Sequence, residues 1–422
     1  MNTESAGYRE LLSKRPLNVQ AVYSSEPAAL VSGRDIAAAA KRRGAIVLAA
    51  NIRNPLTIMG VLRAAREKNA AVLLELAKSE STYCGCTFDN APDMAVRFSA
   101  EMGHGVVFGM HVDHFAIKSG ADMLDAVSRM PRIIERGWTS VAIDASHNPD
   151  WENLCYTRDL AMHIPAYIGL EAEVGEIKGP GEVTTVEEAL YFVGGLNAWG
   201  VFPDYLAISN GSKHGTYDHG AGEAEGIDLE RTLEVARAIE PYGVTIAQHG
   251  ISGTPLDKVS TFSRYGVNKG NVGTLWQNIV FGLEMEPDTG NAIVRDGAYV
   301  KDPARGIPQD LWLEMVEWAD SQGYSRKDGN YKKANKPFND AIMALPQKVR
   351  DRIVDETAEW ARRFIEAFNA EDTAELVLEE AASRVDHNSA PERNISGRRA
   401  LYTADKAPDG GMGSGSEKDF SD

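Results

Sequence analysis

Eight short apolar runs, separated by segments long enough for a helix, constrain the fold of this chain more than any other feature. We predict strands at 45–51, 71–77, 105–111, 140–146, 167–174, 205–210, 244–249 and 266–271. Apolar strands that alternate with helices indicate βαβ units and a parallel sheet buried on both faces. Eight such units fit a (β/α)8 TIM barrel, whose usual size is about 250 residues. An open doubly wound sheet is the alternative, although no glycine-rich dinucleotide fingerprint favours it.

The intervening segments are mostly amphipathic, as at 55–68 and at 228–239, where Asp228 fits an N-cap. We therefore divide the chain into four parts. They are an N-terminal helical segment at 1–44, the catalytic barrel at 45–285, a loop and helix extension at 286–385, and a disordered tail at 386–422.

The extension is predicted to hold one helix near 310–321 and a strongly amphipathic helix over 347–371. An apolar stripe on the second helix predicts a docking or dimer face, and hence a homodimer or a higher homo-oligomer. The stripe consists of Val349, Ile353, Trp360, Phe364 and Phe368.

Charge and cysteine content limit the partners and the compartment. The formal net charge of −17 argues against nucleic acid and anionic membranes, because both need clustered Lys and Arg. Three cysteines do not make a disulfide framework, which favours a reducing cytoplasm. The N-terminus lacks the apolar core of a signal peptide, and no apolar run approaches the ~18–20 residues of a membrane span.

Histidines recur in short motifs at three predicted strand ends. His111-Val-Asp113-His114 follows the third strand, Lys-His214-Gly-Thr-Tyr the sixth, and His249-Gly-Ile-Ser252-Gly the seventh. Side chains at the C-terminal ends of barrel strands build the active site. Three neutral imidazoles and an open position hold a catalytic zinc ion. A structural histidine in a turn is the alternative for any one of them.

Carboxylates follow the same pattern on neighbouring strands. Glu171 and Glu173 alternate on the fifth strand, so both face one side, and Asp144 ends the fourth strand. Buried carboxylates are costly unless they meet a cation. Together they are candidates for a second or alternative metal position, with salt bridges as the other interpretation.

The last two predicted loops have the composition of a phosphate site. Glycine lets backbone N–H groups approach an anion, and Ser and Thr add donors. In such barrels the loops after strands seven and eight usually bind phosphate. The candidate substrate-binding residues, with Asn51 at the end of the first strand, are Asn51, Gly250, Ser252, Gly253, Lys269, Asn271 and Thr274.

These motifs, in this order over roughly 45–285, resemble the zinc-dependent class II fructose-bisphosphate aldolases and their ketose-bisphosphate relatives. The resemblance implies a catalytic Asp113, with Glu173 and Asp144 as second or alternative metal ligands. It implies Asn271 at the substrate and Gly250, Ser252 and Thr274 at the ketose phosphate. The implied zinc ligands are His114, His214 and His249.

The resemblance also implies a mobile acidic loop whose glutamate moves the substrate proton, and Glu182 is the nearest match, with Glu176 as its competitor. At two positions this chain departs from the residues usual in the family. Gly273 stands where the family usually has an Asp near the phosphate, and Asp218 stands where a Lys commonly follows the His-Gly-x-Tyr motif. The residue that binds the distal phosphate is not identified by the resemblance. Candidates by position are Lys78, Lys178, Lys213 and Arg53.

The implied reaction is reversible cleavage of a phosphorylated ketose, foremost fructose 1,6-bisphosphate, to dihydroxyacetone phosphate and an aldehyde, in glycolysis and gluconeogenesis. A zinc ion would stabilise the enediolate as a Lewis acid, and a monovalent cation is an additional candidate ion. The rivals are a Schiff-base aldolase using Lys269, a metal-dependent sugar isomerase, and a non-catalytic sugar-phosphate or metal-binding regulator. A zinc hydrolase is disfavoured. Such enzymes usually carry a His-x-His pair at the first strand, where this chain has Ala-Ala-Asn51.

Overall fold

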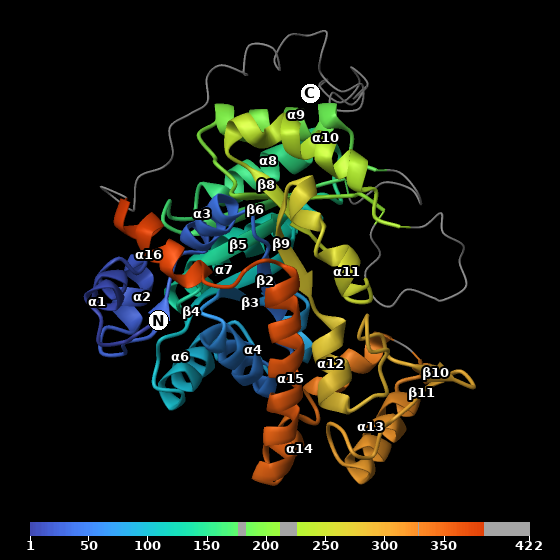
Figure 1. Ribbon diagram of the computed structural model, residues 1–422. Coiled ribbons are helices and arrows are strands. Elements are labelled where there is room, and N and C mark those ends of the chain that lie inside the picture. The colour runs from blue at the N-terminus through green and yellow to red at the C-terminus, as the bar shows by residue number, and fades with distance from the viewer. Residues whose placement is uncertain (176–182, 212–225, 328, 384–422) are drawn as a thin grey trace.

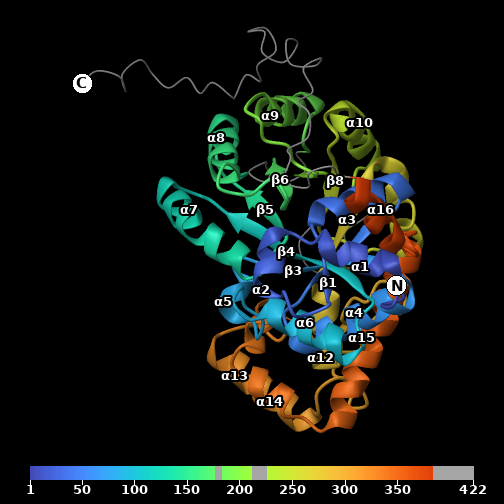
Figure 2. The ribbon, with the colours of Figure 1, turned by 90° about the vertical axis from the view of Figure 1, so that its left-hand side faces the viewer.

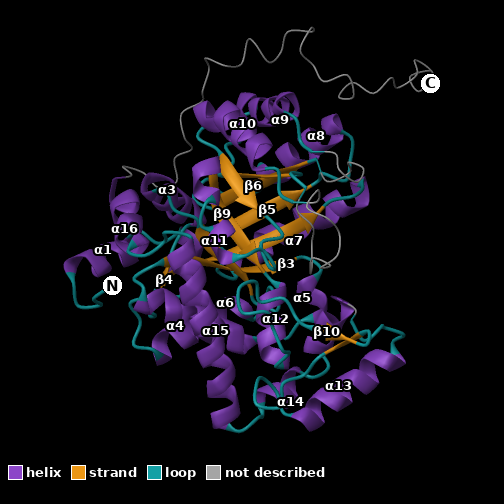
Figure 3. Ribbon diagram, turned by 45° about the vertical axis from the view of Figure 1, so that its right-hand side comes forward, coloured by secondary structure: helices purple, strands orange, loops and turns teal. Residues whose placement is uncertain are grey.

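A closed barrel of parallel strands lies at the centre of the structure, a computed structural model that describes residues 1–175, 183–211, 226–327 and 329–383 (Figure 3). The eight strands β2 to β9 pair in chain order, and β9 pairs with β2 to close the ring. The predicted TIM barrel is therefore confirmed. The strands are β2 Val47–Asn51, β3 Ala71–Ala77, β4 Val107–Ala116, β5 Ser140–Asp144, β6 Gly169–Val174, β7 Tyr205–Ile208, β8 Thr245–Gln248 and β9 Val267–Val272.

Helices surround the barrel, and local sequence signals fix where several of them begin (Figure 1). The side chain of Asp228 accepts a hydrogen bond from the Arg231 amide, as expected of an N-cap. Thr185 and Glu188 form a reciprocal capping box at the start of another helix. The helices between strands are α4 Pro55–Glu67, α5 Glu80–Tyr83, α6 Ala91–Glu101, α7 Gly120–Glu135, α8 Asp150–Ala161, α9 Val186–Ala198, α10 Leu229–Ile239, η1 Glu240–Tyr242, α11 Leu256–Val259 and η2 Phe262–Tyr265.

The N-terminal segment closes the bottom of the barrel, at the N-terminal ends of the strands. It forms α1 Ala6–Ser13, α2 Leu17–Val22 and α3 Gly33–Arg43, and also a two-residue strand, β1 Ala29–Leu30, that pairs with β4. Helix α16 Thr373–Ser383, from the other end of the described chain, packs beside α3 (Figure 2). Helices α1, α3 and α16 and strand β1 share one apolar cluster with inward-facing strand residues, so the barrel is a filled core rather than a pore.

The extension after the barrel packs against its outer helices. Helix α12 Thr274–Phe281 follows β9 and still belongs to the barrel; the elements of the extension are β10 Val294–Arg295, β11 Ala298–Tyr299, α13 Gln309–Ser321, η3 Gly329–Asn335, α14 Asn339–Met343 and α15 Gln347–Ala367. Helix α13 matches the helix predicted near 310–321, whereas the β10–β11 hairpin is not foreseen in the sequence. None of the helices within the described ranges is long and apolar enough to cross a bilayer.

The apolar stripe of α15 is used within the chain. The helix lies along α4 and α12, and all but one of its five stripe residues are buried (Figure 1). The stripe therefore gives no argument for a second copy of the chain, contrary to its interpretation as a dimer face. The predicted tail at 386–422 lies outside the described residues.

We expect Phe364→Ala to destabilise the protein by about 3–5 kcal/mol, because it removes a fully buried ring from a packed aromatic cluster. Phe364 is 1% exposed, and its ring packs against those of Trp276, Trp360 and Phe368. Urea unfolding measures the change. Leu313→Ala, at a position 52% exposed on α13, is the control and should change stability by less than about 0.5 kcal/mol. Equal effects of the two substitutions would contradict the packing of α15.

Candidate active site

A bulge near the end of β4 places two consecutive side chains at the barrel mouth. Successive residues of a regular strand face opposite sides, so Asp113 and His114 could not both point inward without one. The β4–β5 register shifts between Val112 and Phe115, and His114 has φ +40°, which is unusual for a residue other than glycine. The bulge turns His114 towards the site that Asp113 already faces.

His114 and His249 meet across the mouth of the barrel. His249 follows β8, and its Nδ1 lies 2.7 Å from Nε2 of His114. The ring centroids are 4.4 Å apart with an interplanar angle of 74°. Two imidazoles from strands far apart in sequence thus direct one nitrogen each to the same point, as the sequence predicts for a shared ion.

The outer nitrogen of each ring lies against a carboxylate. His249 Nε2 is 2.8 Å from Oε1 of Glu171, and His114 Nδ1 is 2.9 Å from Oε1 of Glu173 and 3.7 Å from Oδ2 of Asp144. A carboxylate on the outer nitrogen fixes the orientation and tautomer of a metal-binding imidazole. Glu171 and Glu173 face inward together, as their period-2 spacing predicts.

The site carries an excess of negative charge. Burial alone would lower the pKa of His114, but the carboxylates of Glu173 and Asp113 outweigh it and raise the pKa well above its ordinary value. Burial, together with the neighbouring Asp144, raises the pKa of Glu173. Both directions show that a positive charge between these groups is strongly favoured.

Asp113 is held by two amides in a nearly closed environment. Asn51 Nδ2 donates to Oδ2 at 3.1 Å, and Asn271 Nδ2 donates to Oδ1 at 3.1 Å. Burial would raise the pKa of Asp113, but His114 and Lys269 lower it below its usual range. The carboxylate is therefore ionised and rigidly oriented, which suits a group that accepts a proton from a bound molecule.

Lys269 lies one layer deeper in the barrel than the sequence analysis places it. Its fully buried ammonium contacts Glu171 Oε2 at 2.8 Å and Glu75 Oε2 at 3.1 Å. Burial would lower the pKa of Lys269, but these two carboxylates outweigh it and raise the pKa. The ammonium is thus fully buried and paired with two carboxylates, whereas a Schiff-base nucleophile needs a neutral amine.

His111 belongs to this deeper layer and not to the mouth. Its Nδ1 lies 2.7 Å from Ser140 Oγ, and its Nε2 lies 3.3 Å from Lys269 Nζ. Burial and the Lys269 charge hold the pKa of His111 well below its ordinary value, so the ring is neutral. The first histidine of the His-Val-Asp-His motif is thus part of the support beneath the site.

The loops after β8 and β9 adjoin, as expected of a phosphate site. Gly250 and Gly253 adopt positive φ values of 70° and 91°. Ser252 Oγ accepts a hydrogen bond from the Gly273 amide at 3.1 Å and so ties the two loops together. Thr274 begins α12 directly after this contact.

Arg53 and Glu80 form an ion pair beside Asp113 that the sequence analysis does not assemble. Arg53 Nε contacts Glu80 Oε1 at 2.6 Å, and Glu80 Oε2 accepts from Asn51 Nδ2 at 3.2 Å. Arg53 was one of four candidates for a distal phosphate, whereas Glu80 had no assigned role. Lys78, another of the four, donates to Ala116 O at 3.0 Å and is thus used locally.

Several predicted residues lie outside the described part of the chain. These are the third histidine and its neighbours, and the acidic loop after β6, namely Glu176, Lys178, Glu182, Lys213, His214 and Asp218.

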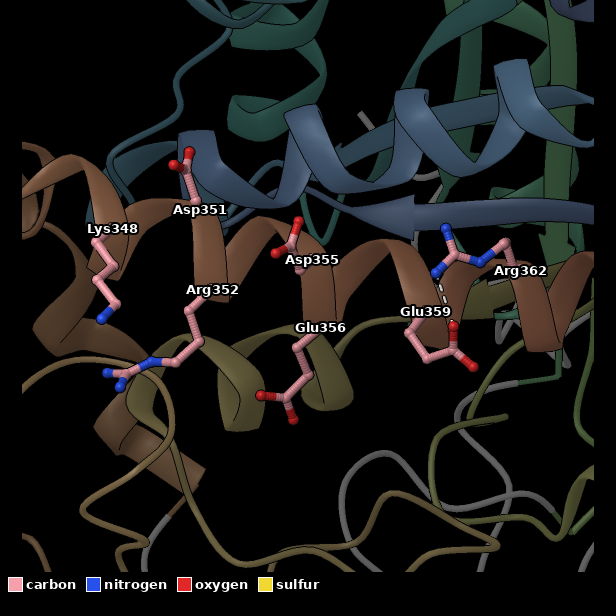
Figure 4. Close-up of a pocket in the computed structure, with 7 residues that line it drawn as sticks. All are labelled: Lys348, Asp351, Arg352, Asp355, Glu356, Glu359 and Arg362. Atoms are coloured by element: carbon pink, nitrogen blue, oxygen red, sulfur yellow. Dashed lines mark hydrogen bonds and ion pairs between the residues drawn. The ribbon is translucent and has the colours of Figure 1, made fainter.

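A concavity with a volume of about 690 Å³ runs along α15, away from this site (Figure 4). Its walls are charged side chains of both signs, and several pair locally, as Arg362 does with Glu359 at 2.7 Å. No residue predicted for the active site contributes to it. The lining residues are Lys348, Asp351, Arg352, Asp355, Glu356, Glu359 and Arg362.

Comparison with known proteins places this site in a family. Residues 31–324 match the profile of the family described as fructose-bisphosphate aldolase class-II. The fructose-bisphosphate aldolase of Streptococcus pyogenes serotype M3 (strain ATCC BAA-595 / MGAS315) is 32% identical over 254 residues, which cover 58% of this chain and 79% of the relative. The fructose-bisphosphate aldolase of Treponema pallidum (strain Nichols) is 28% identical over 256 residues, covering 57% of this chain and 74% of the relative.

The barrel also resembles solved structures. The YdjI aldolase from Escherichia coli K12 superposes with a TM-score of 0.53 at 18% identity, covering 81% of this chain and 98% of that one. This likeness concerns the fold alone. Taken with the profile match, it leads to one conclusion: the chain belongs to the class II fructose-bisphosphate aldolase family, and it is an aldolase, a carbon–carbon lyase.

Proposed function

We propose that this aldolase reversibly cleaves fructose 1,6-bisphosphate to dihydroxyacetone phosphate and an aldehyde, with the help of a zinc ion. The observation that carries the proposal is the convergence of His114 Nε2 and His249 Nδ1 at 2.7 Å. The relatives from Streptococcus pyogenes and Treponema pallidum, both named fructose-bisphosphate aldolase, support the substrate.

The residues present fit a metal ion. If each outer ring nitrogen donates its proton to a carboxylate, both inner nitrogens carry lone pairs that point at one another. Such an arrangement is repulsive unless a cation or a proton lies between them. Two imidazole nitrogens, surrounded by an excess of carboxylates, suit zinc better than magnesium or calcium, which prefer oxygen ligands.

His114 and His249 would hold the ion, and we assign His214 as the third ligand from its motif. Glu173 and Asp144 lie on the outer nitrogen of His114, a position that fits an orienting role. His114, Asp144 and Glu173 also bring three ligand atoms within 4.8 Å of one another, so they are our candidates for a second or alternative ion. A monovalent cation stays a prediction, as do a homo-oligomeric state and a cytoplasmic location.

When bound, the ion supplies Lewis-acid polarisation of the ketose carbonyl. Asp113 accepts the proton of the hydroxyl group whose carbon becomes the aldehyde, and returns it in the condensation direction. Asn51 and Asn271 hold the carboxylate in the orientation that this transfer needs. Glu182 is our candidate for the group that exchanges the proton on the other product.

The ketose phosphate would bind where the β8 and β9 loops adjoin. Gly250 and Gly253 expose backbone there, and Ser252 and Thr274 add hydroxyl groups. Lys269, which the sequence groups with these residues, would act instead below the site through Glu171 and Glu75. The geometry thus disfavours the Schiff-base mechanism on Lys269.

We expect Asp113→Ala to keep the metal and to lower kcat by about 10²–10⁴-fold, the usual contribution of a positioned acid or base. Asp113 contacts two amides and lies beside His114 without being needed as a ligand in our assignment. Cleavage kinetics and metal analysis of the purified variant measure both properties. Loss of the metal together with activity would show that Asp113 is a ligand.

Chelation should abolish cleavage, and added Zn²⁺ should restore it, because carbonyl polarisation depends on the ion.

Treatment with borohydride in the presence of fructose 1,6-bisphosphate should leave the enzyme active, since no imine forms on Lys269. Full activity in EDTA, or inactivation by borohydride, would overturn the metal mechanism.

We expect Glu171→Gln to weaken zinc affinity by about 10–100-fold, because the amide no longer fixes the orientation of His249 as a carboxylate does. Competition with a chromogenic chelator measures the affinity. Glu152→Gln, at an exposed position on α8, is the matched control and should leave the affinity unchanged. An unaltered affinity in both variants would mean that Glu171 does not support the metal ligand.

A further inference from the structure

We propose that Glu80 is a positioning residue, whose carboxylate fixes the side-chain amide of Asn51 and thereby the carboxylate of Asp113. The inference rests on the proposed aldol reaction, in which Asp113 moves the hydroxyl proton on the aldehyde half. The sequence motifs give Glu80 no role. Because Glu80 is 3% exposed, its effect on the reaction has to pass through the residues that it contacts.

The amide of Asn51 is shared between two carboxylates. Its Nδ2 lies 3.1 Å from Asp113 Oδ2 and 3.2 Å from Glu80 Oε2, so one hydrogen serves each acceptor. The Asn51 Oδ1 atom faces Gly273, where a Cβ atom would lie 2.9 Å from it. A flipped amide would direct this oxygen at the two carboxylates, which would repel it. Glu80 thus reinforces the orientation in which the N–H groups of Asn51 face Asp113.

Donors from the ends of two strands hold the Glu80 carboxylate itself. Oε1 accepts from Arg53 Nε at 2.6 Å, and Oε2 accepts from the backbone N–H of Ala77 at 3.2 Å, in addition to Asn51. An ion pair that only neutralised Arg53 would need one of these oxygens. Ala77 ends β3 and is the register partner of Asp113 on β4. Glu80 therefore contacts the surroundings of Asp113 through both a side chain and the backbone.

The short helix that carries Glu80 depends on the extension for its position. Helix α5 has four residues, and a single turn is not stable alone. Segment η3 packs on it, and Lys336 Nζ donates to the carbonyl oxygen of Thr82 at 2.8 Å. The side chain of Asn339 lies so close to Gly85, just after α5, that no Cβ atom would fit there. A segment outside the barrel thus supports the turn on which the positioning residue lies.

The two amides that bind Asp113 are held unequally. Asn271 Nδ2 donates to Asp113 Oδ1 at 3.1 Å, and among the described residues Asn271 Oδ1 has no hydrogen-bond partner. The amide of Asn51, by contrast, is fixed by a second carboxylate. Without Glu80, both amides could rotate, and Asp113 would spend less time in the orientation that proton transfer needs.

The test compares two reactions of Glu80→Gln, a substitution of nearly the same shape that replaces one carboxylate oxygen with an N–H donor. Cleavage of fructose 1,6-bisphosphate should lose roughly ten- to hundredfold in kcat, the scale of a hydrogen bond to a charged group, while KM stays unchanged. Exchange of the carbon-bound hydrogen of dihydroxyacetone phosphate in D₂O, followed by NMR, should keep the wild-type rate. This half-reaction uses our candidate Glu182 and not Asp113.

Glu101→Gln is the matched control, because Glu101 also pairs with an arginine, Arg97, but on the surface of α6 with its side chain 53% exposed. It should leave cleavage and exchange at their wild-type rates. If a thermal melt shows that Glu80→Gln does not fold, Asn51→Ser gives the same comparison. It keeps the ion pair of Glu80 and removes the amide link, so the same selective loss of cleavage is expected.

Three results in a folded variant would overturn the inference. They are equal losses of cleavage and exchange, unchanged cleavage, and a rise in KM at unchanged kcat, which would indicate that Glu80 acts on substrate binding. A wild-type enzyme that neither cleaves fructose 1,6-bisphosphate nor exchanges the hydrogen of dihydroxyacetone phosphate would instead refute the proposed function.

Discussion

The buried ammonium of Lys269 is the interaction on which the rest of the site depends. Glu171 and Glu75 are both fully buried inside the barrel, where an unpaired carboxylate would cost several kcal/mol. Lys269 contacts both at 2.8 and 3.1 Å and makes their burial tolerable. Glu171 uses Oε2 to contact Lys269 and presents its second oxygen, Oε1, to His249. The ammonium of Lys269, below the barrel mouth, thus stabilises the carboxylate that contacts His249, our proposed metal ligand at the mouth.

Contacts with carboxylates also orient the imidazole rings of His114 and His249. His249 is fixed from below by Glu171, and His114 is fixed from the side by Glu173. His114 reaches that place only because β4 bulges and accepts a left-handed backbone conformation at this residue. Strained backbone of this kind persists where the surroundings over-determine it, and here two strands and a carboxylate do so. His114 and His249 are therefore oriented by carboxylates of β6, a strand of the barrel wall.

The sequence predicts the barrel well because its strands are apolar runs buried on both faces and alternate with helices, some of which begin at capping residues such as Thr185 and Asp228. It misses β1, β10 and β11, which have two residues each and therefore no periodicity. It places His114, His249, Asp113 and Glu173 at strand ends, and the structure brings these side chains close together at the barrel mouth. It misplaces Lys269, because period-2 spacing puts residues 269 and 271 on one face but does not reveal their depth. Two residues along a strand separate them by roughly 6.6 Å, which is the difference between the core and the mouth.

The departure at Gly273 is explained by neighbours that are distant in sequence. Where the family resemblance leads one to expect a carboxylate, Arg53 and Asn51 occupy the adjacent space, and the carboxylate that pairs with Arg53 comes from Glu80 on α5. Glycine at 273 and arginine at 53 are thus compatible with each other, while an acidic residue at 273 would compete with Glu80 for the same guanidinium. Helix α5 also packs against η3 of the extension. Gly273, the Arg53–Glu80 ion pair and the packing of the extension on α5 therefore adjoin one another beside Asn51, which also binds Asp113.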